Sequence, residues 1–277
     1  MNLTTRRRLL ATGCALGTAA LAGCTEGLAE SQQEVRTVSP GDAERFEAIN
    51  RNGRLEVQAW NRPRVELDVT KRRFPGSAPF EAVTVETSVS DGTLRIEPRY
   101  DTNPTNAGIL VDLVVKVPST LLAERVETAN GEAVLRGSPG NPVVRSDNGR
   151  AVARNVRGYV TLETSNGEIR AIGCDGIDGA RTSNGAIDVE VLSLRQDADL
   201  QVSNGRITIR ASDDLDADVL LETNNGSIDT SGVDLQNVST SQNRVEGRLG
   251  EGGFRLYARS TNGAVELSGI EGSLGLE

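Results

Sequence analysis

Short runs of alternating hydrophobic and polar residues fill residues 119–277, and Asn-Gly joins the runs in pairs. Around Asn148, the candidate inward residues are Val144, Ser146, Ala151 and Ala153, with mostly charged or polar residues between them. A period of two residues predicts strands with one buried face. Asn-Gly supplies the positive φ angles of a tight turn. We therefore predict paired strands with a turn at every Asn-Gly.

The Asn-Gly dipeptide recurs with a nearly constant period. Its asparagines are evenly spaced from Asn130 to Asn184, and the later copies keep a similar spacing when a degenerate Asn243-Arg244 is counted. A nearly fixed period of about 18–20 residues indicates a repeat fold. An isolated further copy, Asn52-Gly53, lies upstream. We predict that the repeated asparagine side chains stack into a ladder along one edge; they are Asn130, Asn148, Asn166, Asn184, Asn204, Asn225 and Asn262.

Two all-β folds fit this repeat. In a β-solenoid each unit is one coil, and equivalent positions stack about 4.8 Å apart. In an antiparallel meander each Asn-Gly closes a hairpin, and the strands form a sandwich or a barrel. The constant period, the repeated turn residue and the lack of aromatic residues at inward positions favour the solenoid. We predict about seven to eight coils, each of about 18–20 residues, within residues 119–277.

Residues 42–118 also alternate, but without a constant period. Alternating runs lie at residues 54–60, 65–69, 83–87, 94–97 and 109–117, and the last is the most hydrophobic. A solenoid needs a terminal cap over its open end. We therefore predict that residues 42–118 form an irregular, β-rich N-terminal cap.

Three sequence features resemble one protein family. They are Gly-Arg-Leu-Glu-Val-Gln-Ala-Trp at 53–60, Val-Asp-Leu-Val-Val-Lys-Val-Pro at 111–118, and the Thr-x-Asn-Gly repeats. Together they resemble the DUF4097 domains, which are adhesin-like β-solenoids of bacterial and archaeal envelope proteins, over residues 46–266. The resemblance implies a stacked-β body exposed at a surface. It implies no particular activity and no catalytic motif.

Residues 1–23 have the layout of a signal peptide. Arg6 and Arg7 open a basic region, and the following apolar stretch to Gly23 is too short to span a membrane, which takes about 20 residues. The twin arginine resembles a Tat signal, with an ordinary Sec signal as the alternative. Leu21-Ala22-Gly23-Cys24 resembles a lipobox, so we predict cleavage before Cys24 and acylation of its thiol.

The composition also indicates where in the cell the protein is located. Residues 24–41 are small and polar, and we expect a flexible tether between the lipid on Cys24 and the folded body. The chain carries 30 Lys and Arg against 39 Asp and Glu, and Lys71 and Lys116 are its lysines. An acidic, lysine-poor, exported chain looks haloarchaeal. We expect it at the outer face of the cell membrane, with membrane lipid as a partner through Cys24.

The same composition excludes several function classes. The chain has no histidine, so histidine-based triads and histidine metal ligands are excluded. The net charge of −9 and the eight aromatic residues argue against a nucleic-acid partner. We expect no cofactor and no metal site. The single cysteine of the body, Cys174, is expected to be a buried apolar residue.

Acidic residues are the remaining candidates for chemistry. Asp175 with Asp178, Asp188 with Glu190, and the run from Asp213 to Asp218 could serve a glycan-active enzyme. The run from Asp213 to Asp218 could also bind calcium. A solvated acidic face is the simpler interpretation of all three. Beyond the signal peptide, two sequons are present, at Asn225 and Asn237. Because Asn225 belongs to the predicted ladder, Asn237 is the better glycosylation candidate.

These observations predict a lipid-anchored, adhesin-like structural or interaction protein without catalytic activity. Solenoid coils offer rigid, repeated faces that suit a surface protein or a glycan ligand. One alternative is a polysaccharide-active enzyme on the same scaffold. Another is an envelope-stress sensing module.

Overall fold

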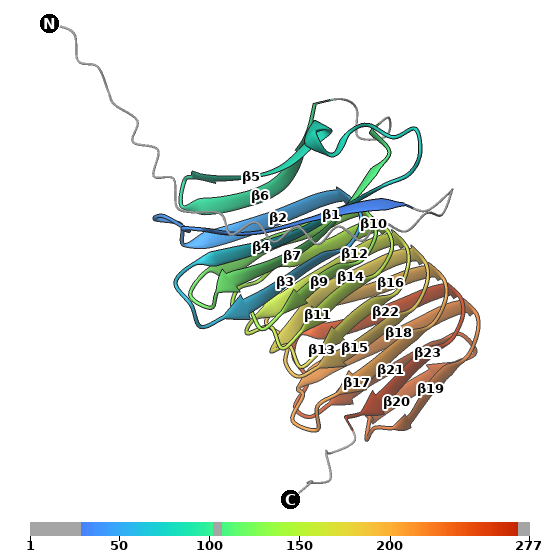
Figure 1. Ribbon diagram of the computed structural model, residues 1–277. Helices are drawn as coiled ribbons and strands as arrows, with labels where there is room; N and C mark the ends of the chain where they lie inside the picture. Colours follow the sequence, from blue (N-terminus) through green and yellow to red (C-terminus); the bar gives the residue numbers. More distant parts are fainter. Residues whose placement is uncertain (1–28, 102–106, 271–277) are drawn as a thin grey trace, which may run out of the picture.

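The computed structural model describes residues 29–101 and 107–270. Apart from the 3₁₀ turn η1 (Phe80–Ala82), its regular elements are β-strands. The strands form two long sheets, of 11 and 12 strands, that face each other across the core (Figure 1). This all-β architecture is a β-solenoid, as predicted.

Each coil consists of one strand of the 12-stranded sheet, an Asn-Gly turn and one strand of the 11-stranded sheet. Seven such coils lie in residues 119–277 and an eighth lies upstream. In chain order they are β2 (Arg45–Asn52) with β3 (Leu55–Trp60), β8 (Leu122–Asn130) with β9 (Ala133–Arg136), β10 (Val143–Asn148) with β11 (Ala151–Arg154), β12 (Tyr159–Asn166) with β13 (Ile169–Ile172), β14 (Gly176–Asn184) with β15 (Ile187–Val191), β16 (Ala198–Asn204) with β17 (Ile207–Ala211), β18 (Ala217–Asn225) with β19 (Ile228–Gly232), and β22 (Arg255–Asn262) with β23 (Val265–Gly269).

Neighbouring coils pair in parallel and in register. Asn148 of β10 lies opposite Asn130 of β8 and opposite Asn166 of β12, and Ala151 of β11 lies opposite Ala133 of β9. The two strands that flank each Asn-Gly belong to different sheets, whereas a hairpin places them side by side in one sheet. The solenoid is therefore confirmed, and the antiparallel meander is wrong.

The core lies between the two sheets and is filled by the predicted inward positions. Val144, Leu162, Ala151 and Ile169 are fully buried, and equivalent residues stack above and below them. Burying each Val, Leu or Ile side chain contributes about 1.5–3 kcal/mol before entropy is counted. Phe46, in the first coil, is the largest fully buried side chain.

The coils stack in a different order from the chain. The last coil, β22–β23, lies between β16–β17 and β18–β19. At the other end, β6 (Thr93–Tyr100) and β7 (Ile109–Pro118) follow β2–β3 in the chain but stack outside it, so β8–β9 packs directly on the first coil. Every coil presents the same parallel backbone ladder, and this equivalence lets a coil from later in the chain enter the stack.

Two expectations for the N-terminal part were wrong. Asn52-Gly53 is not isolated, because Asn52 lies opposite Asn130 in the parallel pair β2–β8. Residues 42–118 therefore contain a regular coil. Within the expected flexible tether, residues 24–41, β1 (Glu30–Val38) pairs along its whole length with β4 (Val65–Arg73). The strand is mostly polar and exposed, so backbone hydrogen bonds rather than apolar burial hold it, and no hydrophobic pattern reveals it.

Antiparallel strands cover both sheets at the N-terminal end of the stack and the 12-stranded sheet at the far end (Figure 1). β4 and β1 extend the 11-stranded sheet beyond β7, and β5 (Val83–Ser90) extends the other sheet beyond β6. At the far end, β21 (Arg244–Leu249) and β20 (Gln236–Ser241) lie outside β18. The degenerate Asn243-Arg244 belongs to the turn of this hairpin and is not a further coil. Such strands protect the ends of a parallel sheet from uncontrolled pairing.

Glycine at the turn sets how closely the coils approach. Gly149 has a φ of 149°, and a Cβ built on it would clash with the carbonyl oxygen of Gly131 in the preceding coil. The same clash recurs between Gly185 and Gly167, and between Gly205 and Gly185. The clashing atom is a backbone carbonyl oxygen, so it cannot move aside without separating the coils.

We expect Gly149→Ala to destabilise the fold by at least about 3 kcal/mol, because the methyl group collides with backbone in the middle of the stack. The control is Gly76→Ala, which shares a positive φ of 87° but has nothing within 4 Å of a built Cβ. The control should cost about 1–2 kcal/mol, from φ alone. Chemical unfolding measures both, and equal losses would contradict a role for coil contact.

A row of buried hydroxyls runs beside the turns. Thr164 donates to the carbonyl oxygen of Gly149 at 2.9 Å, and Ser146 donates to that of Gly131 at 2.8 Å. The same bond is made by Thr128, Thr182, Thr223 and Ser260. At the equivalent position of the coil β16–β17 the residue is Val202, which is buried and has no hydroxyl to donate.

Val202→Thr should therefore stabilise the protein by about 1 kcal/mol, because the new hydroxyl reaches the carbonyl oxygen of Gly185. The reverse change, Thr182→Val, should cost about as much. Thermal or chemical unfolding of the two variants provides the comparison. A loss of stability in Val202→Thr together with a gain in Thr182→Val would mean that the cost of burying the hydroxyl outweighs the hydrogen bond.

Candidate binding surface

The predicted asparagine residues lie in one row along the edge where the coils turn. Each side-chain amide nitrogen donates to the side-chain oxygen of the neighbouring asparagine, at 2.8–3.0 Å. In spatial order the row is Asn52, Asn130, Asn148, Asn166, Asn184, Asn204, Asn262 and Asn225. Because the amides bond to one another, the row ties the coils together and is a poor site for a ligand.

Asn166→Asp should destabilise the protein at neutral pH by about 1–2 kcal/mol, because a carboxylate cannot donate to the side-chain oxygen of Asn148. Folding then disfavours the charged form and raises the pKa of the new carboxyl. The protonated form is the better tolerated one, so the loss should shrink as the pH falls through the raised pKa and be largely gone near the ordinary aspartate value of about 4. The control is Asn243→Asp, in the β20–β21 turn outside the row. Unfolding measurements on both variants across pH give their losses of stability. Equal losses would contradict a stabilising role for the asparagine row.

The outward faces of both sheets carry mostly paired charges. On the 12-stranded sheet, Arg145 lies 2.9 Å from Asp147, 3.3 Å from Glu163 and 4.0 Å from Glu127. The hydrogen bond to Asp147 raises the pKa of Arg145. Exposed pairs of this kind contribute at most about 1 kcal/mol each. They keep these faces neutral and hydrated rather than reactive.

Several of the acidic residues considered from the sequence are bound to basic or backbone groups. Asp188 lies 3.0 Å from Arg170 and 2.6 Å from Arg210. Glu190 accepts the backbone N–H of Gly173 at 2.8 Å. Asp178 pairs with Arg195. Within residues 29–101 and 107–270, no group of three or more Cys, Asp or Glu is placed to hold a metal ion.

Cys174 lies in the core as expected, with none of its surface exposed. Burial raises the pKa of its thiol to about 11. A thiol that stays protonated at neutral pH is a poor nucleophile. Cys174 is therefore a packing residue.

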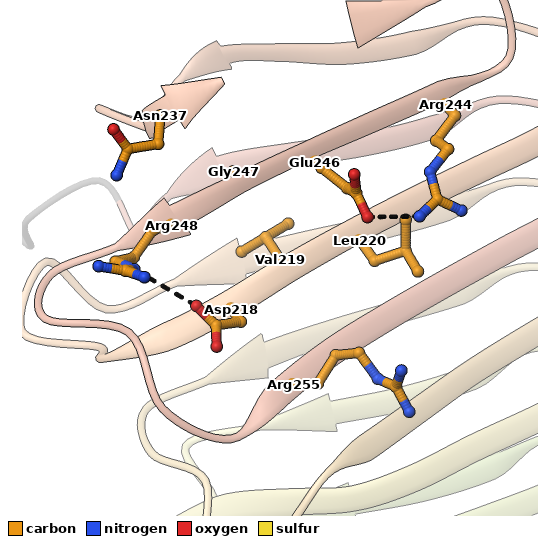
Figure 2. A pocket seen from close by; sticks show the side chains of 9 residues that line it. All are labelled: Asp218, Val219, Leu220, Asn237, Arg244, Glu246, Gly247, Arg248 and Arg255. Carbon is orange, nitrogen blue, oxygen red and sulfur yellow. Dashed lines mark hydrogen bonds and ion pairs between the residues drawn. The ribbon is translucent and has the colours of Figure 1, made fainter. Parts of the chain in front are cut away.

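A hollow of about 340 Å³ opens on the 12-stranded sheet near the far end of the stack (Figure 2). It lies over β18, β21 and β22, and its cations are neutralised. Arg248 lies 3.4 Å from Asp218, and Arg255 lies 3.6 Å from Asp197. Arg244 pairs with Glu246 and Glu222, and its hydrogen bond to Glu246 raises its pKa.

A second, smaller hollow of about 160 Å³ lies on the 11-stranded sheet. We call it the arginine hollow. Its cations come from four neighbouring coils, and its lining residues are Arg54, Glu132, Arg136, Arg150, Val152, Arg154, Glu168 and Arg170. Sequence reasoning missed it. The available signal was arginine at the sixth position after Asn130 and again after Asn148, so that Arg136 and Arg154 lie opposite each other.

The remaining predicted residues are placed as follows. Arg6, Arg7 and Cys24 lie outside the described residues. Asn237 is exposed in β20 with a φ of 52° and lines the larger hollow, and its glycosylation stays a prediction. No helix among the described residues has the length and hydrophobicity needed to cross a membrane.

Comparisons with known proteins give a general likeness. No protein-family model matches the chain and no curated protein matches it, so membership of the DUF4097 family stays a prediction. A "putative lipid binding protein" from Parabacteroides distasonis is 15% identical over 85% of this chain and 96% of its own, with a TM-score of 0.44. A "putative cell adhesion protein" from Clostridium sporogenes is 10% identical over 87% and 100%, with a TM-score of 0.40. Likeness at this level carries no argument about what this chain binds.

Proposed function

We propose that the chain is an exported, lipid-anchored surface protein whose solenoid serves as a rigid, adhesin-like binding scaffold without catalytic activity. The observation that carries the proposal is the position of β1. This strand is the outermost of the 11-stranded sheet at one end, and β19 is the outermost at the other. The N-terminal attachment and the far coils are therefore at opposite ends of the stack.

Chain length connects this position to the proposed anchor. Glu30, the first residue of β1, follows Cys24 by six residues, which reach at most about 20 Å when fully extended. An acylated Cys24 would hold this end of the stack close to the membrane. The ten steps from β1 to β19 span roughly 48 Å at strand spacing. The sheet faces would then be accessible along the solenoid.

The carboxylates support binding over catalysis. A glycosidase needs two carboxyl groups that converge on one bond, with one of them protonated. Here Asp188 and Glu190 each contact a basic side chain, and Asp178 is held by Arg195. These contacts hold the carboxylates in ion pairs, and the pairs do not converge on one bond.

Replacing Cys24 tests the anchor. Cys24→Ser should move the protein from the membrane fraction to the soluble fraction and abolish incorporation of labelled lipid, because the hydroxyl cannot be acylated through sulfur. The matched control is Cys14→Ser, which alters the other cysteine of the N-terminal segment and should stay in the membrane fraction. Retention of Cys24→Ser in the membranes, or equal release of both variants, would contradict the proposed anchor.

A further inference from the structure

We propose that the arginine hollow binds the carboxylate or sulfate groups of an acidic polysaccharide, with Arg154 as the central anion-binding residue. The inference rests on the proposed surface-binding function and names a ligand class and a site for it. It is carried by a local reversal of charge, by an arginine without an acidic partner, and by the apolar floor beneath it.

The hollow is positive on an acidic protein. Its lining contains five arginines and two glutamates, whereas the whole chain has a net charge of −9. Glu56, just beyond the lining, pairs with Arg54 at 2.6 Å and Arg136 at 3.0 Å. Asp188, also beyond the lining, lies 3.0 Å from Arg170. Counting Glu56 and Asp188, five positive charges still face four negative ones. A polyanion repelled by the rest of the surface would be attracted here.

Arg154 is the unpaired charge in this group. Within the part of the chain that the structure describes, no acidic side chain lies within 4.0 Å of its guanidinium, while Arg54, Arg136, Arg150 and Arg170 all have such partners. The Nε atom of Arg154 is buried without a hydrogen-bond partner and cannot reach an incoming anion, so the terminal nitrogens of its guanidinium are the donors available to one. Free donors on a planar guanidinium match the two oxygens of a carboxylate or sulfate.

The arrangement works against stability. Arg154 and Arg136 occupy directly opposite positions on adjacent strands, where like charges repel. Two outward positions nearer the turn, Arg54, Glu132 and Arg150 alternate in sign along the stack, with contacts of 3.4 Å and 2.7 Å. Opposite charges can therefore pair between neighbouring coils, but Arg154 has no acidic partner there. A local conflict of this kind is expected where a residue serves binding rather than folding.

The floor and size of the hollow favour a sugar acid. Val152 and Val134 point to the outer face of the sheet, yet they are only 5% and 1% exposed. Of the two, Val152 lines the hollow, and the small surface that it exposes is the part of the floor that the C–H groups of a ring could contact. The hollow is far smaller than the roughly 300 Å³ at which pockets for drug-sized ligands begin. The outward residues of β9, β11 and β13 include no aromatic side chain, which a protein partner would be expected to use as an anchor.

The larger hollow in Figure 2 provides the contrast. Its three arginines have acidic partners at Asp218, Glu246 and Asp197. An incoming anion would have to break these pairs. The arginine hollow therefore has the more accessible positive charge, although it is smaller.

The test measures binding of the purified full-length chain to polygalacturonate, dextran sulfate, polyglutamate and neutral dextran at about 0.15 M ionic strength. The wild type should bind one or both acidic polysaccharides and not neutral dextran. The two acidic polysaccharides distinguish carboxylate from sulfate as the recognised group. Arg154→Gln should weaken this binding about tenfold or more, since it removes a charged hydrogen-bond donor.

The matched control is Arg181→Gln on the opposite sheet, which makes the same change in net charge at a residue 3.7 Å from Asp199. It should bind like the wild type. Thermal unfolding separates binding from folding: Arg154→Gln should keep or raise the Tm, because it removes a repulsion, whereas a structural role predicts a lower Tm. The proposal is overturned if the wild type binds neither acidic polysaccharide, if both variants weaken binding equally, or if polyglutamate binds as tightly as the acidic polysaccharides. Membrane attachment through Cys24 can hold while this site fails, so the two proposals fail separately.

Discussion

The solenoid depends on one close contact, between the turn glycine of each coil and the glycine carbonyl of the coil beside it. A side chain at Gly149 or Gly185 would push the coils apart. With glycine present, the backbone comes close enough for the asparagine amides to bond at 2.8–3.0 Å and for the Thr164 hydroxyl to reach the Gly149 carbonyl. The turn, both polar rows and the strand register are thus consequences of one steric condition.

The same condition makes coils interchangeable. Because every interface repeats the glycine contact and the ladder, β22–β23 fits between β16–β17 and β18–β19 as well as a coil next in sequence would. Asn262 then bonds to Asn204 on one side and receives a bond from Asn225 on the other. A stack closed by a late coil cannot be completed until nearly the whole chain has been made. This gives the solenoid long-range contacts that a strictly sequential repeat lacks.

Periodicity predicted what the repeat itself determines. The inward residues around Asn148, the turns and the stacking of the ladder asparagines follow from spacing and residue type. Spacing carries no information on spatial order, so the positions of Asn52 and of β22–β23 could not be read from it. β1 was missed for another reason: its polar residues bury no face, and its pairing with β4 depends on backbone groups that every residue shares. The arginine hollow was missed because its residues come from several coils, and the pattern within one coil does not show which side chains meet between coils.

A repeat fold offers a particular way to recognise functional residues. On the outer faces each side chain has neighbours about 4.8 Å away in the adjacent coils, so charges of opposite sign can pair along the stack. Arg145 does so with Glu127 and Glu163. Where neighbouring coils instead place two arginines together, as at Arg136 and Arg154, the repeat contributes repulsion that stacking does not need. The departure from the repeat, rather than the repeat, is then the feature that points to a ligand, and its charge indicates which kind.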